Sequence, residues 1–150
     1  MAGTVFDLNT AAADLLDCVC SALTRHATDF PGSPGCPCRR GLVPGQPSWE
    51  ACDTPCASAG DPLEPDRAGG QLTVNVARLF ESQPSRFPSE VRTVLSLKAC
   101  EPTVTVAELD VTLLRCARAG TDVCPPTPEE LAAAAAVLHT DMLVTRSAIG

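Results

Sequence analysis

The stretch Gln71-Leu-Thr-Val-Asn-Val-Ala-Arg-Leu-Phe80 decides the fold class, because apolar and polar residues alternate along its first half. In an extended chain Leu72, Val74 and Val76 point to one face, and the polar residues between them point to the other. A period of two residues indicates a β-strand with one buried face.

Two later segments show related patterns, at Val91–Lys98 and at about Thr103–Cys116, and Arg39–Val43 could form one short strand. In the third strand the apolar phase shifts by one residue between Val106 and Ala107, which suggests a β-bulge there. Strands that follow one another through short connections favour an antiparallel sheet. We therefore expect an antiparallel sheet of three to five strands.

The N-terminal segment predicts a helix from about Asn9 to His26, with Asn9 or Thr10 as its N-cap. Its apolar residues recur at helical spacing and define one face: Leu15, Leu16, Val19, Cys20 and Leu23. We expect Leu16 to be a core residue.

The C-terminal segment has the clearest start signal in the chain. Thr127-Pro-Glu-Glu130 reads as an N-cap, a proline at the first helical position and a capping-box glutamate. Four apolar residues then follow at spacings of four, three and four: Leu131, Ala135, Leu138 and Met142. We expect this face, with Leu138 at its centre, to pack on the core.

These elements predict a single α+β domain over residues 1–150, with both helices on one face of the sheet. Residues 27–70 differ in texture, because they hold eight of the fourteen prolines, seven of the ten glycines and four cysteines. Prolines exclude a regular helix there. We expect a long Pro/Gly/Cys-rich loop between the first helix and the sheet.

Composition restricts the function classes. Apolar residues make up 45% of the chain and aromatic residues only 3%, which disfavours base-stacking surfaces and aromatic-lined ligand pockets. A formal charge of −7 disfavours contact with phosphate backbones and anionic membranes. Neither a targeting segment nor an apolar run of membrane-spanning length is visible, so we expect a soluble protein.

Nine cysteines leave several interpretations open. Four of them could bind zinc as thiolates, although the first pair has only one intervening residue: Cys36, Cys38, Cys52 and Cys56. The same residues could form disulfides within the loop or remain free thiols. We expect no metal site, and we expect replacement of Cys36 and Cys38 by serine to leave the fold intact.

Other cysteines suggest structural roles. Cys116 and Cys124 could bridge in an oxidising environment, and Cys20 falls on the apolar face of the first helix. Without a visible signal peptide, the default expectation is a cytosolic origin with reduced thiols.

No catalytic constellation is apparent, so we expect neither an enzyme nor a cofactor. The two histidines, His26 and His139, each fall on a predicted helix, where surface positions explain them. The carboxylate pairs have structural explanations: Glu129 and Glu130 in a helix cap, and Glu108 and Asp110 on the polar phase of a strand. Charges of opposite sign on neighbouring strands, including Arg92 and Lys98, favour cross-strand pairing.

Three segments together resemble neck proteins of tailed phages of actinobacteria, and the layout is similar to that of the tail terminator. They are Gly70-Gln-Leu-Thr-Val-Asn-Val-Ala-Arg-Leu79, Thr105-Val-Ala-Glu-Leu-Asp-Val-Thr-Leu-Leu-Arg-Cys116 and Cys124-Pro-Pro-Thr-Pro-Glu-Glu-Leu-Ala-Ala-Ala134. The resemblance spans roughly residues 9–146, and the loop at 27–70 departs from a minimal version of that fold.

The resemblance implies a structural virion protein made in the host cytoplasm. It implies a homo-oligomeric, hexameric ring at the head-proximal end of the tail tube, which ends tube polymerisation and joins tail to head. The implied partners are further copies of the chain, the major tail tube protein and the head-completion (stopper) protein, with DNA passing through without specific binding. The alternatives are another neck or minor virion component, and a small Cys-rich metal-binding module.

Overall fold

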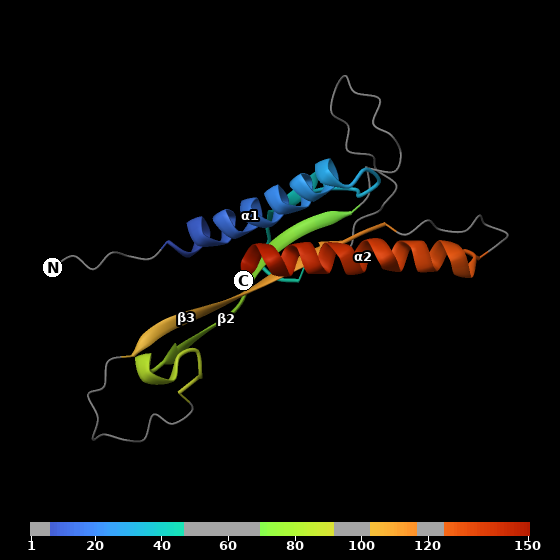
Figure 1. Cartoon of the computed structure of the whole chain (residues 1–150). Coiled ribbons are helices and arrows are strands. Elements are labelled where there is room, and N and C mark those ends of the chain that lie inside the picture. Colours follow the sequence, from blue (N-terminus) through green and yellow to red (C-terminus); the bar gives the residue numbers. More distant parts are fainter. Residues whose placement is uncertain (1–6, 47–69, 92–102, 117–124) are drawn as a thin grey trace.

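The computed structural model describes residues 7–46, 70–91, 103–116 and 125–150. Two helices and a three-stranded sheet make up this part of the chain (Figure 1). In chain order the elements are α1 (Leu8–Asp29), β1 (Arg39–Leu42), β2 (Gln71–Ser82), the 3-10 helix η2 (Pro84–Arg86), β3 (Val104–Leu114) and α2 (Pro128–Ile149). The α+β class is therefore as expected.

Helix α1 forms where its apolar periodicity predicts it, but it begins earlier. Asp7 is the N-cap, and its carboxylate accepts hydrogen bonds from the backbone N–H groups of Asn9 and Thr10. The Thr10 hydroxyl also donates to this carboxylate at 2.7 Å. These bonds, the hydroxyl bond above all, hold the pKa of Asp7 below its ordinary value. The expected caps Asn9 and Thr10 instead lie inside the first turn.

The sheet has the order β1-β2-β3 and is mixed, so the expectation of a purely antiparallel sheet is wrong. Strand β2 pairs with β3 antiparallel, whereas β1 pairs with β2 in parallel, with Arg39 opposite Gln71. Parallel neighbours require a crossover connection of a dozen or more residues. Residues 43–70 are long enough to provide one, and strand pattern alone does not encode direction.

The β-bulge lies in β2 and not in β3. The register slips between Val76 and Arg78, so that Ala77 is the extra residue, while β3 continues without interruption. The two apolar phases of β3 are simply the two faces of one regular strand. Because of the bulge, Arg78 lies opposite Glu108 on one face, and Leu79 continues the face of Leu72 and Val74.

The core lies on one face of the sheet. Its buried members come from α1 and β2: Ala12, Leu16, Val19, Cys20, Leu23, Leu72 and Val74. Leu16 is thus a core residue, as expected. Val111 and Leu113 of β3 and Val144 of α2 pack against this cluster from its margins, so both helices meet the same face of the sheet.

Gly70 fixes the start of β2. Its φ of +114° is a conformation that L side chains rarely adopt, and a Cβ there would collide with the carbonyl oxygen of Leu114. Only glycine fits at this junction between the start of β2 and the end of β3.

Several sequence-based expectations fall outside the described residues. They are residues 92–98 of the predicted strand Val91–Lys98, residues 47–69 of the long loop, the charged residues Arg92 and Lys98, and the cysteines Cys52, Cys56 and Cys124. Within the described ranges no helix is long and apolar enough to cross a membrane.

Candidate functional site

Helix α2 is fixed at its start by the expected capping box. The Thr127 hydroxyl accepts a hydrogen bond from the backbone N–H of Glu130 at 3.2 Å. The Glu130 carboxylate in turn accepts one from the backbone N–H of Thr127 at 2.8 Å. Glu129 and Glu130 therefore stabilise the start of α2, because negative charge near a helix N-terminus interacts favourably with the helix dipole.

A buried ion pair sets the rotation of α2 about its axis. The Arg115 guanidinium, at the end of β3, donates from Nε to Asp141 Oδ2 at 2.6 Å. The side chains of Arg115 and Asp141 are only 10% and 1% exposed. Arg115 also donates to the backbone carbonyl of Gly35, so it joins β3, α2 and the segment after α1. The side of α2 that carries Asp141 and Val144 is consequently the side that packs inward.

This orientation turns the predicted apolar face of α2 toward solvent. Leu138, expected in the core, is 39% exposed, so that prediction is wrong. Leu131, Met142 and Ile149 are 52%, 61% and 53% exposed. We call the row Leu131, Ala135, Leu138, Met142 and Ile149 the apolar stripe. It runs about 27 Å along the helix, given a rise of about 1.5 Å per residue.

The C-terminal end of β2 and the N-terminal start of β3 extend together away from both helices (Figure 1). We call residues 76–91 and 103–108 the β-arm. Leu79 lies on the face that forms the core elsewhere in the sheet, yet it is 58% exposed because neither helix covers this end. The β-arm therefore presents a second apolar surface.

Ion pairs link the segments of the β-arm on its opposite face. Arg78 Nε lies 2.6 Å from Glu108 Oε2, and its Nη1 lies 3.1 Å from Glu90 Oε2. The Arg78 guanidinium also stacks over the Phe80 ring, 4.5 Å from its centroid. Glu108 thus makes a cross-strand ion pair with Arg78, whereas its expected partners Arg92 and Lys98 lie outside the described residues. Ser82 adds a bond from its hydroxyl to the Ser89 carbonyl, so the β-arm is internally braced.

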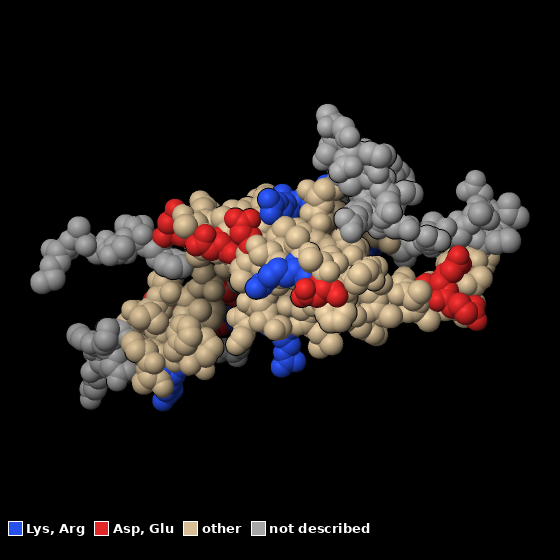
Figure 2. Space-filling model, turned by 45° about the horizontal axis from the view of Figure 1, so that its top comes forward, with Lys and Arg blue, Asp and Glu red and all other residues tan. Residues whose placement is uncertain are grey.

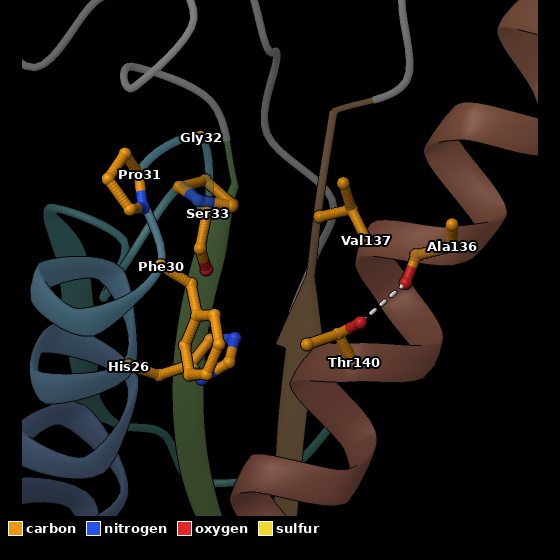
Figure 3. Close-up of a pocket in the computed structure, with 9 residues that line it drawn as sticks. His26, Phe30, Pro31, Gly32, Ser33, Ala136, Val137 and Thr140 are labelled. Atoms are coloured by element: carbon orange, nitrogen blue, oxygen red, sulfur yellow. Dashed lines mark hydrogen bonds between the residues drawn. The ribbon is translucent and has the colours of Figure 1, made fainter.

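A groove of about 450 Å³ lies between the end of α1 and the middle of α2 (Figure 3). His26 and Phe30 line one side, with their rings 4.6 Å apart, and Val137 and Thr140 line the other. The Thr140 hydroxyl is already bonded to the Ala136 carbonyl. The groove has a mostly apolar lining without converging polar groups, which is a poor setting for catalysis.

The cysteines depart from the expectation of reduced thiols. Cys20 is buried, as expected, but it forms a disulfide with Cys36. Cys38 and Cys116 are disulfide-bonded as well, and Cys18 is a free, exposed thiol. A disulfide sulfur is not a thiolate ligand, which speaks against zinc bound by the four loop cysteines. Elsewhere in the described ranges, no group of three or more candidate ligands lies close enough to hold a metal ion.

The Cys20–Cys36 disulfide is expected to stabilise the fold, contrary to the expectation that Cys36 is dispensable. It closes a loop with a sequence separation of 16, and a loop of that size is worth about 2–4 kcal/mol. We expect Cys36→Ser to lower the free energy of unfolding by that amount in denaturant titrations. Cys18→Ser, two residues from Cys20, is the control and should leave it unchanged. Equal stabilities of the two variants would contradict a stabilising role.

The remaining predicted residues are not brought together. His26 stacks on Phe30 in the last turn of α1, and His139 is exposed on α2. Asp110 is exposed on β3. Sequence reasoning missed Arg115 and Asp141, although an aspartate within an Ala-rich helix is a signal that could have identified them. On the face shown in Figure 2, uncharged surface covers most of the described area, and acidic side chains gather at the start of α2.

The chain matches no known family model, no curated protein and no solved structure at a significant level. The most distinctive surfaces of the described residues are the apolar stripe and the β-arm.

Proposed function

We propose that this chain is a non-enzymatic structural subunit of a phage virion. Copies of it form a hexameric ring at the head-proximal end of the tail tube, which ends tube polymerisation and joins the tail to the head. The proposal comes from the resemblance of three sequence segments to phage neck proteins, and the structural observation that supports the assembly it requires is the apolar stripe of α2. Large contiguous apolar patches are rare on the free surface of monomeric soluble proteins and mark sites of protein contact.

The absence of a catalytic arrangement in the described part of the chain supports a structural role. Neither histidine is hydrogen-bonded to a nucleophile or a carboxylate of a described residue, and the groove beside His26 is mostly apolar. Catalysis by a thiol or hydroxyl requires an adjacent base. In the groove neither the Ser33 nor the Thr140 hydroxyl is hydrogen-bonded to His26, and the Thr140 hydroxyl donates to the Ala136 carbonyl.

The charge and the disulfides are compatible with a virion component. A chain with a formal charge of −7 lets DNA pass without holding its phosphates. Disulfides persist in oxidising surroundings, which a particle meets after release from its host. Under this proposal the protein partners are further copies of the chain, the tail tube protein and the head-completion protein.

A virion that lacks this protein tests the proposal. We expect tails of uncontrolled length, because nothing stops polymerisation of the tube, or tails that fail to join heads. Electron microscopy of particles from a host infected with a deletion phage measures both, and expression of the wild-type chain from a plasmid should restore normal virions.

The deletion phenotype also separates the alternatives. Tails of normal length that remain unattached to heads would favour another neck component over the tail terminator. Normal-length tails joined to heads in the absence of the protein would refute the assignment.

A further inference from the structure

The β-arm and the apolar stripe are two different apolar surfaces on one chain. The β-arm leaves Leu79 exposed on the face that is core elsewhere, and Val76 beside the bulge is 37% exposed. The stripe leaves Leu138 and Met142 exposed on α2. The β-arm does not cover the stripe of its own chain, because both surfaces are exposed in the same subunit.

We propose that the β-arm of one copy packs on the apolar stripe of the next copy, with Leu79 against Leu138 and Met142. This contact rests on the proposed function, and it specifies how neighbouring subunits join. When one surface of a chain fits a different surface of an identical chain, the copies join head to tail. Such contacts generate a ring when the rotation closes.

Two exposed side chains of opposite charge favour the β-arm of another copy as the partner of the apolar stripe. Glu81 lies on the same face of the β-arm as Leu79, and Arg146 follows Met142 one turn later on α2. Both are exposed, and neither makes an ion pair with any described residue. Glu81 accepts only a hydrogen bond from the Thr105 hydroxyl, at 2.8 Å. Each subunit thus offers an unpaired carboxylate beside one apolar surface and an unpaired guanidinium beside the other.

The spacings of these pairs also agree. Leu79 and Glu81 are two residues apart on a strand, which is about 6.6 Å at about 3.3 Å per residue. Met142 and Arg146 are four residues apart on a helix, which is about 6 Å at about 1.5 Å per residue. A β-arm lying along α2 can therefore place Leu79 on Met142 and Glu81 on Arg146 at the same time.

Aspartate substitutions test the two surfaces in particles complemented by plasmid-borne variants. Leu79→Asp and Met142→Asp should each reduce incorporation of the chain into virions at least about 30-fold, as for a central interface residue. The matched control is Leu143→Asp, because Leu143 is 68% exposed but lies about 100° around the helix from Met142. We expect it to behave as wild type, and thermal unfolding of the free subunits should be alike for all three.

A charge exchange tests the pairing of Glu81 with Arg146. Glu81→Arg and Arg146→Glu should each lower incorporation about fivefold or more, since each places like charges together. The double variant should return to within about twofold of wild type. Additive losses in the double variant would overturn the proposed pairing.

Photo-crosslinking identifies the occupant of the stripe directly. Particles that carry a benzophenone amino acid in place of Leu79 should, after irradiation, yield a crosslinked dimer of this chain. Mass spectrometry should map the crosslink to the tryptic peptide 119–146. With the same amino acid in place of Leu138, crosslinks from position 138 to position 138, or from position 138 to the tail tube protein, would overturn the inference and leave the ring proposal standing. If the chain is absent from wild-type virions, the proposed function fails as well.

Discussion

Asp141→Ala is expected to lower the free energy of unfolding by about 3–5 kcal/mol, because it leaves the buried Arg115 guanidinium without its counter-charge. Arg115 would keep its bond to the Gly35 carbonyl, but a neutral acceptor compensates a buried cation only in part. Urea-induced unfolding followed by circular dichroism measures the loss.

The control for this prediction is an ion pair of equal length in a different environment. Arg78 and Glu108 are also 2.6 Å apart, but their side chains are 53% and 48% exposed. Solvent screens such a pair, so Glu108→Ala should leave the free energy of unfolding nearly unchanged. The double variant Arg115→Met/Asp141→Leu should recover much of the stability lost in Asp141→Ala, because it leaves no buried charge. Similar losses in Asp141→Ala and Glu108→Ala would show that burial does not decide the strength of these pairs.

Leu16→Ala is expected to destabilise the free subunit by about 2–5 kcal/mol, whereas Leu138→Ala should cost less than about 1 kcal/mol. The reason is burial: Leu16 is 8% exposed within the core cluster, and Leu138 is 39% exposed on the apolar stripe. Chemical denaturation of the two variants under identical conditions gives the comparison.

A loss at Leu138 equal to that at Leu16 would mean that α2 packs through the stripe, as its sequence pattern suggests. Under the proposed function the ranking of effects should change in the assembled particle, because Leu138→Ala removes part of the proposed contact with the neighbouring copy.

The parts of the fold that the sequence predicts are those in which local pattern and tertiary environment agree. The apolar face of α1 packs inward with Leu16, Val19 and Leu23 buried. The alternation at the start of β2 buries Leu72 and Val74 against that helix. The capping box at Thr127 is local by nature, so it needs no tertiary information.

The orientation of α2 could not be predicted, because apolar periodicity identifies an apolar face without identifying what covers it. In a helix whose first half is rich in alanine, little apolar area distinguishes one side from another, and the buried pair with Arg115 turns the Asp141 side inward. Strand direction is similarly absent from a period-two pattern, which is why the parallel pairing of β1 was missed. The disulfide of Cys20 depends on where Cys36 lies in space, at a Cα–Cα distance of 5.0 Å, and spacing along the chain does not reveal that.

The single extra residue in β2 has a geometric consequence for any assembly built through the β-arm. A bulge bends its strand and increases the local twist, and Ala77 lies where the covered part of the sheet ends and the β-arm begins. The five residues of β2 beyond it reach about 17 Å at about 3.3 Å per residue, and their pairing with β3 keeps this length stiff. A stiff rod converts a small bend at its base into a large displacement at its tip. The angle between adjacent subunits, and with it the bore of a closed ring, would then be determined at one alanine.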